Sequence, residues 1–321
     1  MTRREFQGGS RLQVLAGRLP KAAPRRKSVV TIGVFDGVHV GHKRILDEVI
    51  LLAHGLGALG IVVTFDPHPV SVLHPVETPQ MLTTLSEKLG LIAGAGLRKT
   101  LVLKFTPGLS RRRADWFVRR VLLNKLNMTR LVVGYDFRFG RGREGDARYL
   151  ETLGEDLGFG VDIVPPVRFG GHPVSSTRIR TALSRGDAGS AAKMLGRPYS
   201  ICGMVVRGEG RGRLLSYPTA NLEVEDGKMI PREGIYAVMV ARGRRVEPGV
   251  LYIGRKPTYR GEATSIEVHV LGRVGSLYGK ALEVRFIERL RGDRAFGSDA
   301  ALRRAIGRDI RRASRLLRIN A

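Results

Sequence analysis

Cysteine is almost absent from this sequence, which holds a single one, Cys202. A lone cysteine excludes an intramolecular disulfide and a zinc site built from several cysteines. Long apolar runs are also missing, since none comes near the roughly 20 residues that a membrane-spanning helix needs. The basic segment 1–27 has no apolar stretch of the kind found in secretory signals. These absences predict a cytoplasmic protein that does not enter a membrane.

Acidic side chains are scarce relative to basic ones: 29 Asp and Glu stand against 55 Lys and Arg, a net charge of +26. The excess is +14 over residues 1–186 and +12 over residues 187–321, so it is not confined to a tail. Such a charge attracts polyanions, and we expect weak, non-specific nucleic-acid binding from it. The excess has two alternative explanations, a compositional bias of the source organism or a genuine polyanion partner. The sequence does not decide whether the chain forms a homo-oligomer.

The first half of the chain alternates strand-like and helix-like segments. Alternation with short links predicts a parallel sheet covered on both faces, with ligands outside the carboxyl ends of the strands. Ser86 and Ser110 are the expected first residues of two of the helices. The expected strands cover 28–35, 60–65, 100–105, 130–137 and 161–167, and the expected helices cover 42–57, 86–96, 110–126 and 145–158.

The pattern changes after the string "STRIRTALSRGD", and from about residue 199 the chain shows β-runs separated by turn signals. Such spacing predicts an antiparallel barrel. The last segment, 299–318, has an apolar stripe at helical spacing and an opposite face that is nearly all arginine. We therefore expect an α/β domain over residues 1–186, then a β-barrel domain with a C-terminal helix over residues 187–321.

The string "GVFDGVHVGH" at 33–42 places two imidazoles where a strand runs into a helix. A helix N-terminus carries free N–H groups and partial positive charge, which suit phosphate. His39 and His42 can donate hydrogen bonds to a triphosphate, and Gly41 would let a nucleotide approach the backbone. A metal site would need further ligands, which the neighbouring sequence does not offer. The chain has no GxxxxGK[ST] loop, which argues against a P-loop kinase.

This string closely resembles the signature of the HxGH nucleotidyltransferases. Together with "TFDPHP" at 64–69, "VGYDFRFGRGREGD" at 133–146 and "VSSTRIRTALSRG" at 174–186, it resembles the adenylyltransferase half of the prokaryotic bifunctional riboflavin kinase/FMN adenylyltransferases, or FAD synthetases. The resemblance implies a Rossmann-like domain that transfers AMP from ATP to FMN. It implies ATP-binding residues Gly33, Phe35, Asp36, His39, Gly41, His42, Ser176, Thr177 and Arg180, with His39 and His42 catalytic, and flavin-side residues Phe65, Asp66, Pro67, His68 and Asp136.

The second half carries the string "PTAN" at 218–221 after a glycine-rich run. Thr219 and Asn221 lie two apart on an extended segment, so their oxygens point to one side and suit Mg²⁺ on a nucleotide. Phosphorylation of a hydroxyl calls for a carboxylate base. "PTAN", "GIYA", "IGRKPTY" and "SIEVHVL" together resemble the riboflavin kinase half of the same family. The resemblance implies Glu267 as base, ATP-binding residues Gly203, Gly208, Gly210, Gly212, Pro218, Thr219 and Asn221, metal ligands Thr219 and Asn221, and Arg291 as a flavin contact.

The resemblance covers about residues 12–318, and its departures from the family pattern are few. Ser216 stands where the family usually has glycine, and Tyr135 stands where it more often has glutamate. The expected reactions are riboflavin plus ATP to FMN, then FMN plus ATP to FAD with release of pyrophosphate, each with Mg²⁺. Two other functions stay open. One is a nucleotidyltransferase with a different acceptor, which the "PTAN" half disfavours; the other is a nucleic-acid-binding protein, which the low aromatic content of 6% disfavours.

Overall fold

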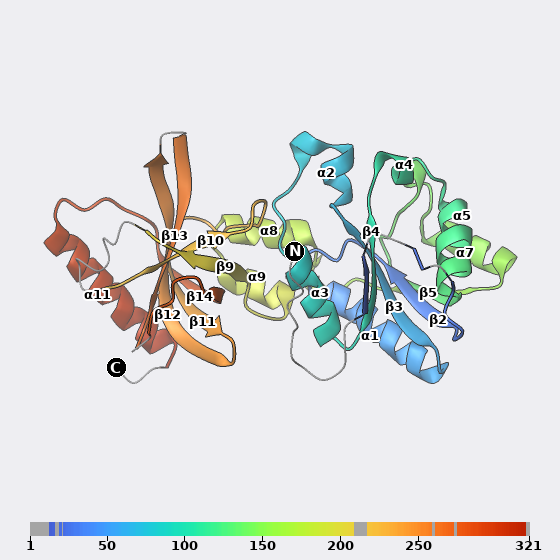
Figure 1. Cartoon of the computed structure of the whole chain (residues 1–321), viewed down its shortest axis with the longest axis horizontal. Helices are drawn as coiled ribbons and strands as arrows, with labels where there is room; N and C mark the ends of the chain where they lie inside the picture. Colours follow the sequence, from blue (N-terminus) through green and yellow to red (C-terminus); the bar gives the residue numbers. More distant parts are fainter. Residues whose placement is uncertain are drawn as a thin grey trace. The chain divides into compact units, whose positions relative to one another are not determined.

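The computed structural model describes residues 13–16, 19–20, 22–208, 217–258, 261–272 and 275–318. The chain divides into two compact units, Met1–Val174 and Ser175–Ala321 (Figure 1). The boundary predicted at 186/187 differs from this division by one helix, α8 (Ser176–Ser184), which belongs to the second unit.

The first unit is built on a six-stranded sheet in the order β1-β4-β3-β2-β5-β6, with every neighbouring pair parallel. This arrangement confirms the predicted parallel sheet, and β1 was missed by the sequence analysis. The strands are β1 (Gln13–Ala16), β2 (Ser28–Ile32), β3 (Leu59–Asp66), β4 (Lys99–Lys104), β5 (Met128–Gly134) and β6 (Gly160–Val164), and a separate two-stranded sheet pairs β7 (Arg168–Phe169) with β8 (His172–Pro173).

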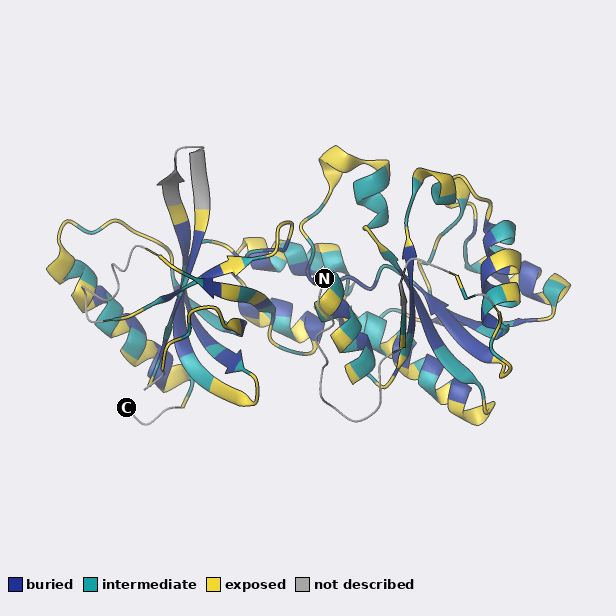
Figure 2. Cartoon of the chain, viewed as in Figure 1, coloured by how far each residue is buried: buried dark blue, intermediate teal, exposed yellow. Residues whose placement is uncertain are grey.

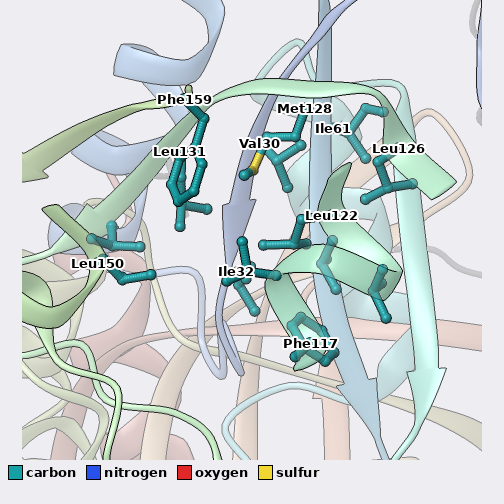
Figure 3. Close-up of a cluster of buried hydrophobic side chains, with 14 of the residues drawn as sticks. Val30, Ile32, Ile61, Phe117, Leu122, Leu126, Met128, Leu131, Leu150 and Phe159 are labelled. Carbon is teal, nitrogen blue, oxygen red and sulfur yellow. The ribbon is translucent and has the colours of Figure 1, made fainter. Parts of the chain in front are cut away.

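Helices cover both faces of this sheet because the strand residues alternate between two apolar cores. Val30 and Ile32 of β2 pack in one core, with side chains from the helical segments 114–126 and 147–157 (Figure 3). Val29 packs in the other core, against helices before β3 and β4. The helices are α1 (Val40–Gly55), α2 (Pro69–Leu73), α3 (Leu85–Gly94), α4 (Pro107–Ser110), α5 (Ala114–Phe117), α6 (Asn124–Leu126) and α7 (Ala147–Leu157), with short 3-10 turns at Pro75–Glu77 and Arg141–Arg143.

Two predicted helix starts are wrong. Ser86 is not the cap of α3; Thr84 is, because its hydroxyl accepts the N–H of Glu87 while the Glu87 carboxylate accepts the N–H of Thr84. Ser110 does not begin a helix over 110–126 but ends α4. The chain then turns, begins α5 at Ala114, and passes through a π-helical stretch, Val118–Leu123, into α6.

The second unit contains a closed antiparallel barrel of six strands in the order β10-β13-β12-β11-β14-β9, as predicted from its β-runs (Figure 1). Two helices, α8 and α9 (Ala188–Leu195), precede it, and α9 was not predicted. The strands are β9 (Ser200–Val206), β10 (Ala220–Val224), β11 (Gly234–Arg242), β12 (Arg245–Thr258), β13 (Gly261–Val270) and β14 (Ala281–Arg291). One row of register partners runs Asn221, Glu267, Tyr252, Ile235 and Arg291 across neighbouring strands.

The C-terminal helix α11 (Asp299–Leu316) packs on the outer face of the barrel, as its apolar stripe predicts. Ala313 and Ile310 of the helix join Ile235 and Val250 of the barrel in one apolar cluster. The arginine-rich face of the helix stays exposed (Figure 2). Because Ile235 lies in this cluster, the register row that contains Glu267 also lies on the outer face of the barrel.

Candidate functional site

Each unit holds one group of polar side chains that its fold brings together. In the first unit the group follows β2. His39 is the N-cap of α1, and its Nδ1 accepts the backbone N–H of His42 over 3.2 Å. Because Nδ1 is the acceptor, the proton of the neutral His39 ring is on Nε2. The two rings stack with centroids 3.6 Å apart, and Phe35 meets His42 edge-on at 5.2 Å.

Burial, the neighbouring His39 and the Lys88 ammonium lower the pKa of His42 well below its ordinary value. A neutral ring explains how two imidazoles can stack without repulsion. His42 Nδ1 is shielded from solvent and has no hydrogen-bond partner among the described residues. Gly41 makes room for the pair, since a Cβ there would lie 3.1 Å from the His39 ring. The first unit therefore holds two neutral imidazoles at a helix N-terminus, suited to donate to an anion.

The loop between β2 and α1 has an unusual backbone. Phe35 and Val38 adopt φ of 51° and 39°, in the left-handed region that side chains disfavour, and Gly37 has φ of 82°. Such a conformation persists only where the surroundings fix it. Asp36 does this: its carboxylate accepts the N–H groups of Leu82 and Thr83 at 3.1 and 3.0 Å. Asp36 and Phe35 are buried and help to hold this loop, and their contact with ATP stays a prediction.

The predicted flavin-side residues follow β3 and β5 at the carboxyl edge of the sheet. Phe65 is half-buried against Phe105, and the Asp66–Pro67 peptide bond is cis. His68 is the N-cap of α2, where its Nδ1 accepts the N–H of Val70 over 3.1 Å. Asp66, Pro67 and Asp136 are exposed, and Gly33, at the end of β2, lies against the Phe35 ring. β2, β3 and β5 are neighbours, so their ends share one edge.

The second predicted nucleotide-binding string forms helix α8. Ser175, not Ser176, is its cap, because the Ser175 hydroxyl accepts the N–H of Arg178 over 3.3 Å. Ser176, Thr177 and Arg180 lie in the first two turns, Thr177 exposed and the other two half-buried. Helix α8 lies in the second unit, whereas His39 and His42 lie in the first.

The polar group of the barrel centres on Glu267, which lies on β13. One carboxylate oxygen accepts the hydroxyl of Thr219 over 2.9 Å, and the other accepts the hydroxyl of Ser265 over 3.2 Å. Asn221 is the register partner of Glu267 on β10. The fold thus brings a carboxylate, a hydroxyl and an amide together from segments almost 50 residues apart.

The "PTAN" segment is also held from outside this group. His269 Nδ1 lies 2.8 Å from the carbonyl oxygen of Pro218, and the His269 ring meets Tyr217 edge-on. Gly208 lies directly against Asn221, because a Cβ at Gly208 would come within 2.0 Å of the Asn221 amide nitrogen. Of the other predicted phosphate-binding glycines, Gly203 lies inside β9 rather than in a loop, and Gly210 and Gly212, like Ser216, lie outside the described residues.

Arg291, a predicted flavin contact, is bound by a residue of α11. Its guanidinium donates to both carboxylate oxygens of Asp309, with Nε and Nη2 distances of 3.1 and 2.8 Å to Oδ2. Tyr252, in the same register row, donates to Asp293 over 3.0 Å. Burial and the nearby carboxylates of Asp293 and Glu267 raise the pKa of Tyr252 to about 12, so the Tyr252 hydroxyl keeps its proton and stays a hydrogen-bond donor. The contact of Arg291 with Asp309 fastens α11 to the barrel.

We expect Asp309→Ala to weaken this attachment. Asp309 is mostly buried, and its loss leaves the Arg291 guanidinium without its carboxylate. A hydrogen-bonded charge pair of this kind contributes about 2 kcal/mol, which corresponds to about 30-fold faster amide exchange over 299–316 by hydrogen–deuterium exchange. The double variant Arg291→Met with Asp309→Leu should recover most of the protection, because it leaves no unpaired charge. Unchanged exchange in Asp309→Ala would contradict this role.

Comparison with known proteins also divides the chain into two parts, close to its division into two compact units. A family model described as FAD synthetase matches residues 21–178, and one described as riboflavin kinase matches residues 195–317. A bifunctional riboflavin kinase/FMN adenylyltransferase of Pseudomonas fluorescens is 37% identical over 306 residues, covering 95% of this chain and 98% of the relative. This chain belongs to the bifunctional riboflavin kinase/FMN adenylyltransferase family. The Bacillus subtilis member is 34% identical, covering 90% of this chain and 92% of its own.

A solved structure, described as a macrolide-efflux protein from Streptococcus pneumoniae, superposes with a TM-score of 0.84 at 30% identity, covering 91% of this chain and 95% of that one. Its fold is therefore the fold of this chain. Within the part of this chain that the structure describes, no helix is long and apolar enough to span a bilayer. The same residues contain no cluster of three or more His, Cys, Asp or Glu side chains that could hold a metal ion by themselves.

Several residues that contact the two groups were not predicted. Lys88, Thr83 and Tyr252 were missed because each lies far along the chain from the residue it contacts. Ser265 was missed although it lies only two residues from Glu267, and His269, which contacts Pro218, was not assigned to a site. Lys88 did have a signal of its own: a lysine in the first turns of a predicted helix is unfavourable for the helix dipole and calls for a partner.

Proposed function

We propose that this chain makes FMN and FAD at two separate sites, with riboflavin kinase chemistry at the barrel and FMN adenylyltransferase chemistry at the sheet. The single observation that carries the proposal is the meeting of Glu267 with the Thr219 hydroxyl and with its register partner Asn221. The sheet unit by itself holds the stacked His39 and His42. Membership of the bifunctional family supports both activities. Riboflavin, FMN, FAD and ATP are the substrates and products.

At the sheet, the proposed step joins an oxygen of the FMN phosphate to the α-phosphorus of ATP and breaks the bond to the β-phosphate, which leaves as pyrophosphate. His39 donates from Nε2 and His42 from its own ring N–H, because both rings are neutral. Donors fixed in advance stabilise the charge that develops on the transferred phosphorus. Ser176, Thr177 and Arg180 are proposed as further nucleotide contacts, and Phe65–His68 with Asp136 as the flavin side.

At the barrel, Glu267 is the proposed base that takes the proton from the ribityl hydroxyl of riboflavin while that oxygen attacks the γ-phosphorus of ATP. The bond from the γ-phosphorus to the bridging oxygen of the β-phosphate breaks, and ADP leaves. Two hydroxyl groups orient the carboxylate, since Thr219 and Ser265 each donate to one of its oxygens.

ATP-using enzymes of these two families generally work with a divalent metal ion, and we propose Mg²⁺. The donor set at the barrel fits it. The Thr219 hydroxyl donates a hydrogen bond to Glu267, so the lone pairs of the Thr219 oxygen remain for a hard cation. Asn221 offers an amide oxygen. When bound, the ion would neutralise charge on the ATP phosphates.

We expect Gly208→Ala to impair only the kinase. The added Cβ would come within 2.0 Å of Asn221 Nδ2, so the amide must turn away from its position. Displacing one oriented ligand should lower kcat/KM for riboflavin phosphorylation about tenfold or more. The matched control is Gly275→Ala, where a Cβ would meet nothing within 4 Å among the described residues. Equal kinase rates for the two variants would contradict a role for Gly208 and Asn221.

The function is tested by incubating the purified chain with riboflavin, ATP and Mg²⁺ and separating the flavins by chromatography over time. FMN followed by FAD is the expected result. FMN alone would remove the proposed function of the sheet unit and favour a different acceptor there. No conversion of riboflavin would contradict the kinase assignment, and a parallel incubation with FMN would then decide the adenylyltransferase by itself.

A further inference from the structure

Lys88 is a buried cation that the catalytic motifs do not include. It lies in the first turns of α3 and is only 7% exposed. A positive charge near a helix N-terminus is unfavourable, and a buried ammonium group costs more unless polar partners surround it. Its partners are two backbone carbonyls: Nζ donates to Val34 over 3.1 Å and to Phe65 over 3.3 Å. Lys88 therefore connects the loop that begins at Val34 with the end of β3.

The two carbonyls belong to the two halves of the adenylyltransferase site. Val34 begins the loop with the left-handed residues that leads to His39 and His42, and Phe65, near the end of β3, is the first of the proposed flavin-side residues. The hydroxyl of Thr64 donates to the same Val34 carbonyl over 3.1 Å. Since Asp36 ties the middle of the loop to residues 82 and 83, the segment 82–88 braces this loop at both its start and its centre.

The charge of Lys88 faces three titratable groups. Asp36 and Asp66 raise its pKa, while burial, the larger effect, lowers it. His42 faces Lys88 from α1 and stacks on His39. An ammonium group here thus interacts electrostatically with two carboxylates and with the imidazole that the proposed chemistry uses. It holds the backbone by hydrogen bonds and disfavours a second positive charge on His42.

We propose that Lys88 is a positioning residue for adenylyl transfer, because its ammonium group ties the histidine-bearing loop to the end of β3. The inference rests on the proposed function and adds a residue to it. Lys88 acts through the backbone of Val34 and Phe65 on groups that touch the substrates. Its removal should therefore lower kcat for FAD formation more than it weakens ATP binding.

The test compares Lys88→Met, Lys88→Arg and Lys27→Met in the full chain. Lys27 is an exposed lysine of the same unit and serves as the matched control. We expect Lys88→Met to lower kcat for FAD formation from FMN by about tenfold or more, with KM for ATP changed less than about threefold. Lys88→Arg should restore most of kcat, and Lys27→Met should equal the wild type. The titration of His42, followed by NMR, should move to higher pH in Lys88→Met only.

Two results would overturn the proposal. One is a Lys88→Met variant with the kcat of Lys27→Met, or with an unchanged His42 titration. The other is an equal loss in Lys88→Met and Lys88→Arg together with a lowered Tm, which would make the role purely structural. Failure of the proposed function has a different signature, because the wild-type chain would then form no FAD from FMN at all. Riboflavin phosphorylation, measured in each variant, reports that the barrel unit is intact.

Discussion

Glu267→Gln is expected to lower riboflavin phosphorylation by about a hundredfold or more and to leave FAD formation from added FMN unchanged. The variant keeps the size of the side chain and its place opposite Asn221 but cannot take a proton. A positioned general base typically contributes about 10²–10⁴ in rate, which sets the size of the effect. Initial rates with riboflavin and with FMN as separate substrates measure both halves of the prediction.

The control for this prediction is Glu223→Gln, which removes an exposed carboxylate from β10 of the same barrel. It should keep the wild-type rate of phosphorylation. A Glu267→Gln variant that retains more than about a tenth of the rate would show that the carboxylate is not the base, since such a residue contributes at least about a hundredfold. The hydroxyls of Thr219 and Ser265 would then position something other than a proton acceptor.

His39→Ala is expected to abolish FAD formation and to leave FMN formation intact. The change removes one of the two donors at the helix N-terminus, and the loss of one preorganised donor costs about 10²–10³ in kcat. It also removes the cap of α1, because His39 Nδ1 accepts the N–H of His42. Loss of a cap destabilises a protein by about 1 kcal/mol, so a folding effect must be separated from a chemical one.

His39→Asn makes this separation, because asparagine is a good N-cap but has no imidazole. It should have a Tm closer to that of the wild type than His39→Ala has, yet it should form FAD just as slowly. Recovery of FAD formation in His39→Asn would contradict the role of His39 as a donor to phosphate and would leave it a structural cap. Loss of FMN formation in either variant would contradict the independence of the two sites.

The elements of this fold were predictable where the pattern of apolar residues and the short turns along the chain both indicate the same element. Strands such as β2 carry apolar residues on both faces, and the turns around them are short, so the parallel sheet follows from the pattern alone. The start of α3 was mispredicted because Thr84 and Ser86 are both suitable cap residues. The start of α5 was mispredicted because its N-cap, Arg113, makes no side-chain cap hydrogen bond and so leaves no cap signal in the sequence. Thr84 prevails through its reciprocal pair with Glu87, a contact that the simple presence of Ser86 conceals.

The candidate sites were only half predictable. The string around His39 and His42 indicates chemistry because all of its parts are adjacent in sequence. Glu267 could be assigned only through the family resemblance, since its meeting with Thr219 depends on barrel register. Asp36 and Arg291 match the motifs equally well, but their partners, Thr83 and Asp309, lie 47 and 18 residues away. Those partners tie both residues into the fold by contacts that no local pattern reveals.

The most direct test of two independent sites in one chain is complementation between the two inactive variants. Given riboflavin, ATP and Mg²⁺, Glu267→Gln alone should form almost no FMN, and His39→Asn alone should stop at FMN. An equimolar mixture should convert riboflavin to FAD, because each variant supplies the site that the other lacks and FMN passes between them through solution. A mixture that accumulates FMN, or that leaves riboflavin unchanged, would contradict the account.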